Sequence, residues 1–231
     1  MFAGDIKSPH DLKCISCGFI IKNFQKYKFH GEKSFFKKVL RDDRVYKCHS
    51  CELVQVNHRE INNDCLKEYY SNYYRKNSKS LSYENRHYWK FYVRGMAIAD
   101  IAANHFQDKN YPYEIYELGS GFGLNLLKLK DIFPNANIYT DDLDKGSLNK
   151  NIQVSEIDGG KYNIIVLSHV LEHLDDPIQW IVRIKNALKS QGLLIIEVPN
   201  DNEAFSKVTD IYHEPHISFF NSNSLSILFQ R

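Results

Sequence analysis

The stretch from Tyr113 to Phe133, YEIYELGSGFGLNLLKLKDIF, constrains the fold of this chain more than any other. A short apolar run leads into a loop with three glycines, which is followed by apolar residues at helical spacing, including Leu126 and Leu129. Glycines at a junction of strand and helix let the backbone turn sharply and bring its N–H groups close to a ligand. The stretch therefore predicts a βα unit with a ligand site in its turn.

The alternation of strand and helix continues toward the C-terminus. Two runs of nearly continuous apolar residues, KYNIIVLSH from Lys161 and GLLIIEVPN from Gly192, predict buried strands, and ANIYT predicts a shorter strand before them. The helix between the two long runs has clear limits, with Asp176 at its N-cap, Pro177 at its first position and Gly192 past its end. We therefore expect an α/β fold with a doubly wound, mostly parallel sheet and helices on both faces. The third strand is poorly defined, because only QVSEIDGG remains for it.

Two pairs of cysteines dominate the N-terminal segment. Cys14 and Cys17 form one C-x-x-C pair, and Cys48 and Cys51 form another after an interval of 30 residues. Two residues between paired thiolates let both reach one tetrahedral ion from a tight turn, and two such pairs close a four-sulfur shell. The spacing predicts a structural zinc site. The alternatives are a redox dithiol or ordinary buried thiols, but neither pair opens a helix in a thioredoxin-like unit.

The residues after each pair fit this interpretation. Gly18 follows the first pair directly, and Glu52 takes the equivalent place after the second. In a segment whose own core is too small, a metal supplies the folding energy. The fifth cysteine, Cys65, stands outside the spacing and is expected to be a packed thiol.

Three segments follow from these patterns. We expect a zinc-binding module over residues 1–63, a tyrosine-rich connector with a helix over 64–108, and the α/β domain over 109–231. The helix is indicated by apolar residues at helical spacing: Trp89, Tyr92, Val93 and Met96. We expect this apolar side of the helix to pack on the α/β domain.

Composition narrows the class of protein and its surroundings. With 43% hydrophobic and 25% charged residues, the chain is expected to be soluble and globular. It has neither a run of roughly 20 apolar residues for a membrane span nor a signal peptide, and its cysteine spacing suits a reducing compartment, so we expect it in the cytoplasm. Residues 1–80 hold 16 Lys and Arg against 9 Asp and Glu, a net +7, whereas the remainder carries −5. The basic front favours an anionic partner, and the alternative is a solvated lysine-rich surface.

The glycine loop favours S-adenosylmethionine (SAM) over a dinucleotide. Gly119 and Gly121 begin a G-x-G-x-G pattern, whereas dinucleotide sites use G-x-G-x-x-G for close approach of the helix to a pyrophosphate. An acid, Glu117, precedes the first glycine by two positions. The next strand ends at Asp141 and Asp142, where a carboxylate can accept hydrogen bonds from both ribose hydroxyls.

These features, together with SHVLEHLDDP after the fourth strand, resemble the Rossmann-like class I SAM-dependent methyltransferases. The resemblance implies that Gly119 and Gly121 line the methionine portion and that Glu117 contacts its amino group through water. It implies that Asp142 holds the ribose. Asp141 is the alternative, because a shift of one residue in strand register would exchange the two acids.

The resemblance also bears on the residues after the fourth strand. Ser168 and His169 would face the sulfonium, and His169 is a candidate catalytic residue. Glu172 and His173 could be ligands or a base, or could cap and orient the loop. The family's third strand is followed by an acid near adenine, for which this chain offers no assignment.

A narrower resemblance rests on the cysteine module, the tyrosine-rich connector and HEPHISFF. Together they resemble sugar methyltransferases with an N-terminal zinc-binding domain, which methylate carbon 3 of nucleotide-linked 4-keto deoxysugars. That family has a Glu-His pair before the aromatic patch, whereas this chain has Glu214-Pro215-His216 with His213 upstream. His216 matches the family's base, and histidine suits that task near neutral pH. His213 is a second candidate. The displaced glutamate leaves O-methylation of a sugar hydroxyl open beside C-methylation.

Two rival functions remain at this point. An RNA methyltransferase with a zinc finger would use the basic front half, but SHVLEH stands where exocyclic-amine methylation usually requires N-P-P-[FY]. The family usually ends with two further strands, and the sequence stops at Arg231 before them. Either the α/β domain over 109–231 is incomplete at its C-terminus, or the chain is a non-catalytic, methyltransferase-like binding protein, which is the second rival. We expect a small nucleotide-linked or glycan-precursor sugar as acceptor, in preference to nucleic acid. The sequence does not specify the oligomeric state.

Overall fold

The computed structural model describes residues 12–26, 34–73, 86–142, 148–200 and 215–230. The chain divides into two compact units. Unit 1 contains the N-terminal region to Tyr69 together with residues 171–180 and 198–231, and unit 2 contains residues 70–170 and 181–197.

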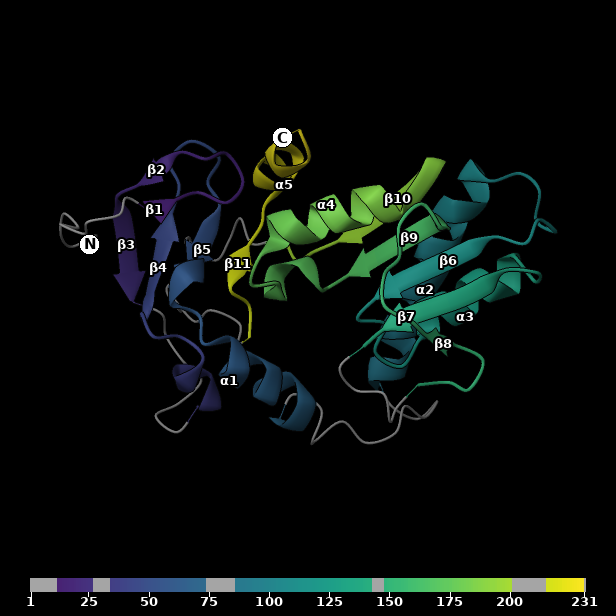
Figure 1. Ribbon diagram of the computed structural model, residues 1–231, viewed down its shortest axis with the longest axis horizontal. Coiled ribbons are helices and arrows are strands. Elements are labelled where there is room, and N and C mark those ends of the chain that lie inside the picture. The colour runs from purple at the N-terminus through teal and green to yellow at the C-terminus, as the bar shows by residue number, and fades with distance from the viewer. Residues whose placement is uncertain (1–11, 27–33, 74–85, 143–147, 201–214, 231) are drawn as a thin grey trace. The chain divides into compact units, whose positions relative to one another are not determined.

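Unit 2 is built on a five-stranded sheet in the order β10-β9-β6-β7-β8, and every pairing in it is parallel (Figure 1). The strands are β6 (Glu114–Leu118), β7 (Asn137–Asp141), β8 (Gln153–Val154), β9 (Tyr162–Ser168) and β10 (Leu188–Glu197). The pairing aligns Leu118 with Asp141, and Ser168 with Glu197, so the carboxyl ends of four strands meet at one edge. The predicted α/β fold with a parallel sheet is confirmed, and the poorly defined third strand is the two-residue β8.

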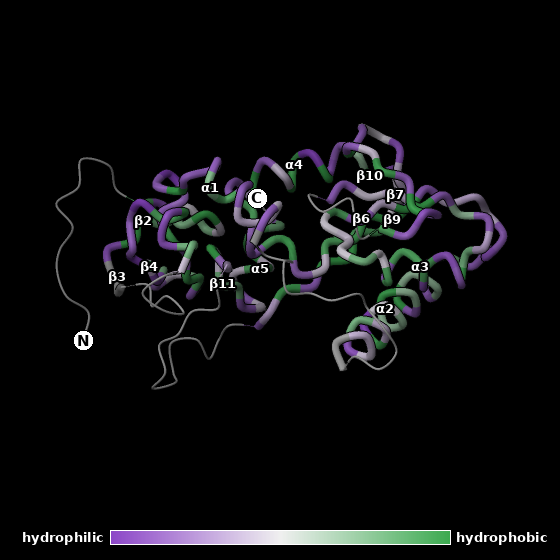
Figure 2. Tube along the Cα trace, turned by 90° about the horizontal axis from the view of Figure 1, so that it is seen from below, coloured by the Kyte–Doolittle hydropathy of each residue, from purple (hydrophilic) through white to green (hydrophobic). Residues whose placement is uncertain are grey.

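Three helices belong wholly or partly to unit 2: α2 (Arg86–His105), α3 (Leu124–Ile132) and α4 (Pro177–Ala187), the last of which crosses the boundary between the units. Helices α2 and α3 lie beside each other (Figure 2). They bury aliphatic side chains against alternate residues of the strands, including Ile98, Leu126, Ile115, Ile138, Ile164 and Val166. This core fixes the loop between β6 and α3 at the carboxyl edge of the sheet.

Helix α4 begins as the sequence predicts but ends differently. The N–H of Gln179 donates to Asp176 Oδ1 at 3.0 Å, which is the predicted N-cap. The predicted end at Gly192 is wrong, because the helix ends at Ala187 and Gly192 lies within β10. The last carbonyl groups of the helix accept hydrogen bonds from the N–H groups of residues 160 and 161, so no glycine cap is needed.

Helix α2 buries a different side from the one that we predicted. Trp89, Val93 and Met96 are 52%, 64% and 39% exposed. The buried positions are instead occupied by small or aliphatic residues, including Gly95, Ile98, Ala99 and Ala102. A Cβ atom at Gly95 would lie 3.2 Å from the carbonyl oxygen of Leu124, so a small residue permits the close approach of α3.

Unit 1 is rich in short strands. A hairpin joins β1 (Leu12–Lys13) and β2 (Ile20–Ile21), and an antiparallel sheet has the order β11-β5-β4-β3. Its strands are β3 (Asn23–Lys26), β4 (Arg44–Lys47), β5 (Val54–Val56) and β11 (Ser218–Phe219). Its helices are η1 (Phe35–Lys38), η2 (His58–Glu60), α1 (Asn63–Glu68), η3 (Tyr69–Tyr73, a π-helix that reaches into unit 2), η5 (Leu171–His173) and α5 (Ser222–Phe229).

The HISFF segment reaches this small sheet through β11, which pairs with β5. Ile217, Phe219 and Phe220 are buried with the aliphatic residues of β4 and β5. Helix α5 then begins with a reciprocal capping box between Asn221 and Ser224. Segments that are far apart in the sequence therefore share one core.

Candidate functional site

The glycine loop lies between β6 and α3 in unit 2. Gly119, Gly121 and Gly123 have φ values of 63°, 62° and 74°, in the left-handed region that residues with a side chain rarely adopt. A Cβ atom on Gly123 would lie 2.1 Å from Ile152 Cδ1, and one on Gly119 would lie 2.8 Å from Val170 Cγ2. The loop therefore requires glycine for both its conformation and its packing.

Glu117 is a buried acid next to this loop, with only 1% of its surface exposed. Its Oε1 atom accepts a hydrogen bond from Asn125 Nδ2 at 2.6 Å, whereas its Oε2 atom has no hydrogen-bond partner among the described residues. Burial raises the pKa of Glu117 to about 8; the hydrogen bond from Asn125 opposes the rise, and the nearby Asp142 carboxylate adds to it. A buried acceptor oxygen of this kind is suited to receive a hydrogen bond from a charged amine.

The two acids after the second strand both contact the loop. Asp142 is 5% exposed, and its Oδ2 atom accepts a hydrogen bond from the N–H of Gly121 at 2.7 Å. Asp141 is partly exposed, and its carbonyl oxygen accepts a hydrogen bond from the N–H of Gly119 at 2.9 Å. The predicted residues Glu117, Gly119, Gly121, Asp141 and Asp142 are therefore brought together in unit 2.

Ser168 and His169 belong to a polar network at the carboxyl end of β9. The Ser168 hydroxyl donates to Glu197 Oε2 at 2.9 Å, and the backbone N–H of His169 donates to the backbone carbonyl oxygen of Glu197 at 2.9 Å. Arg94 Nε donates to Glu197 Oε1 at 3.0 Å, and Arg94 Nη2 lies 2.8 Å from His169 Nε2. The network holds His169 at a positive φ of 55°, a strained conformation for a residue with a side chain.

The His169 ring nitrogen has two competing neighbours. Its Nε2 atom lies 2.8 Å from Arg94 Nη2 and 3.3 Å from Glu197 Oε1. Arginine can only donate, so Nε2 must be an acceptor toward Arg94, whereas it must carry a proton to donate to Glu197. Arg94 and Glu197 therefore compete for the same ring nitrogen of His169.

Glu197 is the anion of this network. Burial by itself would raise the pKa of Glu197, but the contact with His169, the hydrogen bond from Ser168 and the charge of Arg94 outweigh it and lower the pKa to about 2. Neither Arg94 nor Glu197 was predicted from the sequence. The alignment of parallel strand ends could have indicated Glu197, which pairs with Ser168, but nothing local indicates Arg94 on α2.

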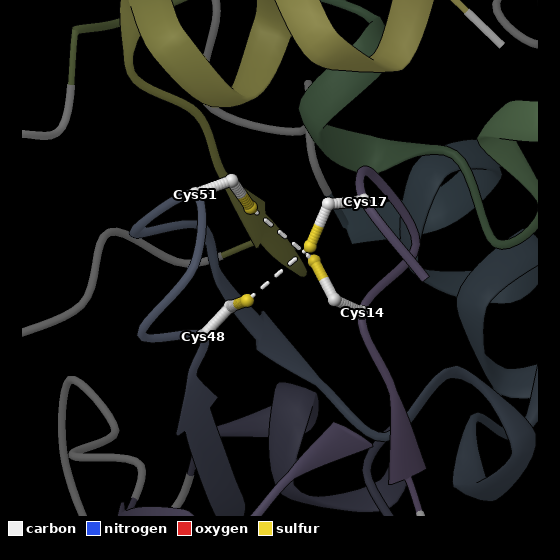
Figure 3. A group of neighbouring side chains, drawn as sticks. All are labelled: Cys14, Cys17, Cys48 and Cys51. Atoms are coloured by element: carbon white, nitrogen blue, oxygen red, sulfur yellow. Dashed lines mark hydrogen bonds between the residues drawn. The ribbon is translucent and has the colours of Figure 1, made fainter. Parts of the chain in front are cut away.

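The four predicted cysteines form one cluster in unit 1 (Figure 3). The Sγ atoms of Cys14 and Cys51 are 3.5 Å apart, as are those of Cys17 and Cys48, and all four lie within 4.8 Å of one another. A tetrahedral ion with bonds of about 2.3 Å to sulfur would separate its sulfur ligands by about 3.8 Å. The cluster therefore fits a tetrahedral metal ion.

The turns that hold the sulfurs are equivalent. The N–H of Gly18 donates to the carbonyl of Cys14, and the N–H of Glu52 donates to the carbonyl of Cys48, both at 2.9 Å. Gly18 and Glu52 have left-handed φ values of 75° and 62°. The expectation that Glu52 takes the place of a glycine is thus confirmed, at a cost in backbone strain. Cys65 lies in α1 and outside the cluster.

His216 lies in a second cluster of unit 1, together with Glu172 and His173. The Nε2 atoms of His216 and His173 are 4.0 and 3.9 Å from Glu172 Oε1. The two imidazole rings meet edge to face, with centroids 4.8 Å apart. His213 lies outside the described residues, and His169 belongs to unit 2.

Comparisons with known proteins bear on the fold and the family. Similar solved structures include the plantazolicin methyltransferase BpumL in complex with S-adenosylhomocysteine (14% identity, TM-score 0.43, 61% of this chain and 57% of that chain). They also include a phosphoethanolamine N-methyltransferase of Haemonchus contortus (13%, TM-score 0.42, 60% and 36%) and the YcgJ protein of Bacillus subtilis (13%, TM-score 0.45, 60% and 67%). The chain thus spans little more than half the length of BpumL. A search of curated protein sequences finds no match.

Among the helices that the structure describes, none combines the length and apolar character that a membrane crossing requires. A family comparison matches residues 86–231, more than half of the sequence, to the methyltransferase domain. This segment contains the glycine loop, Glu117, both acids of the second strand and the Ser168 network. The chain belongs to the methyltransferase domain family.

Proposed function

We propose that this chain is a SAM-dependent methyltransferase whose cofactor site is the glycine loop with Glu117 and Asp142. The observation that carries the proposal is the buried Glu117 carboxyl group, one oxygen of which has no partner among the described residues. The charged amino group of the methionine portion would supply that partner, directly or through a water molecule. A pyrophosphate would instead meet a carboxyl group and be repelled once that group ionised.

Asp142 is the residue that we assign to the ribose. Its carboxylate is already positioned at the loop by the N–H of Gly121, which leaves acceptor capacity for ribose hydroxyls. Asp141 remains the alternative, because it is more exposed and stands beside the same loop. Ser168, the last residue of β9, and His169, which follows it, are proposed to line the site on the side of the sulfonium.

The reaction requires an aligned acceptor and a group that removes its proton. SAM, when bound, supplies a methyl group already activated by positively charged sulfur, so the protein mainly positions the nucleophile. His216 is the candidate for taking the proton of the acceptor, with His213 and His169 as further candidates. Loss of turnover in His216→Ala, with binding of S-adenosylhomocysteine changed no more than a few-fold, would support a role in the chemical step.

The acceptor that we propose is a small anionic molecule, most simply a nucleotide-linked or glycan-precursor sugar that is methylated on carbon or oxygen. The basic N-terminal region and the resemblance to sugar methyltransferases in the cysteine module and HEPHISFF support it. We propose that zinc in the four-cysteine cluster stabilises unit 1 and that the protein works in the cytoplasm, where thiols stay reduced. Methyl transfer from labelled SAM to a panel of nucleotide sugars would test the acceptor, and RNA binding with a steep salt dependence would favour RNA instead.

Calorimetric titration with S-adenosylhomocysteine tests the cofactor site. We expect one site per chain, with affinity reduced at least about 10-fold in Asp142→Asn, because a good charged hydrogen bond contributes roughly 1.5–3 kcal/mol. Asp141→Asn is the matched control and should bind within a few-fold of the unchanged chain. If Asp141→Asn loses binding and Asp142→Asn keeps it, the ribose assignment is exchanged. If the unchanged chain binds no S-adenosylhomocysteine, the proposal is wrong.

A further inference from the structure

The cluster of Glu172, His173 and His216 has the composition of a metal site. Its one carboxylate is fully buried, and the two histidine side chains are 12% and 8% exposed. One ligand atom from each of the three residues lies within 4.8 Å of the other two. A buried carboxylate beside two imidazoles is costly unless a positive charge compensates it, and a cation would do so.

Backbone contacts hold the three ligands in place before any ion binds. The N–H of Ile217 donates to the carbonyl of Glu172 at 2.9 Å, which joins the segment that bears His216 to the segment that bears the other two ligands. His58 supports the same junction, because its Nδ1 atom lies 2.7 Å from the Asp175 carbonyl and its Nε2 atom lies 3.1 Å from Ser218 Oγ. The site therefore does not depend on a long flexible loop to bring its ligands together.

A contact outside the trio selects the ring nitrogen that binds. His173 Nδ1 lies 3.5 Å from the carbonyl oxygen of Pro215, which places its proton on that side and turns the Nε2 lone pair toward Glu172. Histidines that bind metals commonly donate their second ring N–H to a backbone carbonyl in this way. The contact is long, and an ion would be expected to shorten it.

The distances leave room for one ion. Glu172 Oε1 lies 3.9 Å from the Nε2 atom of His173 and 4.0 Å from that of His216, and no two ligand atoms are more than 4.8 Å apart. The point equidistant from the three atoms is therefore at most about 2.5 Å from each of them. Metal–ligand bonds to imidazole and carboxylate are about 2.0–2.2 Å. An inward movement of about 0.4 Å by each side chain, which a rotation of its χ angles can supply, would close the shell.

We propose that Glu172, His173 and His216 bind one divalent first-row transition-metal ion. Two imidazoles and a carboxylate favour Mn²⁺, Fe²⁺ or Zn²⁺ over Ca²⁺ or Mg²⁺, which prefer oxygen ligands alone. Three protein ligands leave positions for water or for an oxygen atom of a substrate. This site is separate from the four-cysteine cluster in its ligand chemistry, and the proposal does not depend on the assigned methyltransferase activity.

The proposal changes the role of His216. An Nε2 lone pair that binds a metal ion cannot also take a proton from an acceptor, so the base and ligand roles exclude each other. In the loaded protein, the ion and not the imidazole would lower the pKa of a bound hydroxyl group. Activity that rises with added Mn²⁺ would favour the ligand role, whereas activity unchanged by metal depletion would favour the base.

Titration of the full chain with Mn²⁺ tests the site, because Mn²⁺ prefers oxygen and nitrogen ligands and binds poorly to thiolates. The protein is first saturated with one equivalent of Zn²⁺ to fill the cysteine cluster. Free Mn²⁺ is then followed by electron paramagnetic resonance. We expect one Mn²⁺ per chain with spin-echo modulation from imidazole nitrogen. Glu172→Gln and His173→Gln should weaken this binding by more than about 100-fold, since even the loss of an outer contact costs 10–100-fold.

Exposed residues provide matched controls. Glu60→Gln and His105→Gln remove the same chemical groups outside the cluster and should retain the binding. Circular dichroism of each variant establishes that it is folded, and His173→Gln, at the more exposed ligand, is the variant that best tolerates the change. If the unchanged chain binds neither Mn²⁺ nor a second equivalent of Zn²⁺, the proposal is overturned. Equal binding by Glu172→Gln, or equal loss of binding in the controls, would overturn it as well. Binding of S-adenosylhomocysteine is measured separately, so either proposal can fail alone.

Discussion

Replacing Glu117 with glutamine should remove a pH dependence from the stability of unit 2. The pKa of this buried acid is about 8 in the folded chain, against 4.5 for an ordinary glutamate. Each pKa unit corresponds to about 1.4 kcal/mol, so full ionisation of Glu117 costs the folded state about 5 kcal/mol. The Glu117→Gln substitution would keep the shape of the side chain and an oxygen acceptor for Asn125 but would leave no proton to lose.

The direction of this pH dependence follows from the number of protons bound by the folded and the unfolded chain. Between about pH 4.5 and pH 8 the folded chain keeps a proton that the unfolded chain has lost, so the free energy of unfolding falls as the pH rises. The stabilisation from the protonated carboxyl is fully present below pH 4.5 and is lost by about pH 8. The advantage of Glu117→Gln over the unchanged chain should therefore grow by about 1.4 kcal/mol per pH unit, to a limit of about 5 kcal/mol.

Urea denaturation between pH 5 and pH 9 measures this difference. The chain has two tryptophans, so a Trp180→Phe background leaves Trp89 on α2 to report the unfolding of unit 2. Asp131→Asn, at a side chain that is 63% exposed, is the control and should show no comparable slope. A stability difference between Glu117→Gln and its parent that is the same at pH 5 and pH 9 would refute the reasoning, because it would show that the Glu117 carboxyl ionises normally.

Three further predictions concern the other clusters. Glu52→Gly should raise the free energy of unfolding of unit 1 by about 1 kcal/mol, because glycine adopts the left-handed backbone conformation of this position without strain. Gly18→Ala should lower the free energy of unfolding by a similar amount, and urea titration of zinc-loaded protein measures both changes. The depressed pKa of Glu197 stabilises the folded chain fully above pH 4.5, and this stabilisation is lost as the pH falls to about 2. Over that range the free energy of unfolding of the unchanged chain should fall by about 1 kcal/mol more than that of Glu197→Gln. The effect is small because the Glu197 side chain is 39% exposed and its charge is partly screened by solvent. Strong chelation should abolish the circular dichroism contribution of unit 1 while Trp89 fluorescence in the Trp180→Phe background stays unchanged. Elemental analysis should find at least one zinc per chain.

The sequence predicts the parallel sheet well because each long strand is encoded locally. The run NIIVL has no alternation and, in β9, it is buried on both faces, as a covered parallel sheet requires. The run LLIIE has the same pattern, but only Ile195 of it is buried, because β10 is the edge strand of the described sheet, so the prediction of a fully buried strand there is wrong. The start of α4 is also local, since Asp176 and Pro177 act within one helical turn. The end of α4 was not predictable in this way, because its last carbonyls are satisfied by residues 160 and 161 from another loop.

The wrong side of α2 shows where hydrophobic patterns mislead. Trp89, Val93 and Met96 dominate any count of hydrophobicity, yet the helix packs with Gly95 and Ala102 inside. Close contact between helices depends on the absence of side-chain volume, which a hydrophobic pattern does not measure. The same limit hides the pairing of β11 with β5, which rests on two residues of each strand and spans more than 160 positions.

The candidate sites differ in the same way: some are recognisable from a short stretch of sequence, and others form only from distant segments. Each C-x-x-C pair, and the glycine loop with its left-handed backbone, can be recognised from a few neighbouring residues. The structure places both sets of residues as their spacing predicts. Arg94 and Glu197 come from segments 103 positions apart, and Glu172 meets His216 across 44 positions. Neither pair can be recognised from neighbouring residues in the sequence. An ion pair or a metal site requires only that the folded chain bring the two side chains together. A sequence motif therefore identifies the candidate cofactor loop. The charged residues beside that loop, and the residues proposed here to bind a metal ion, become visible only in the folded strand ends and the small sheet.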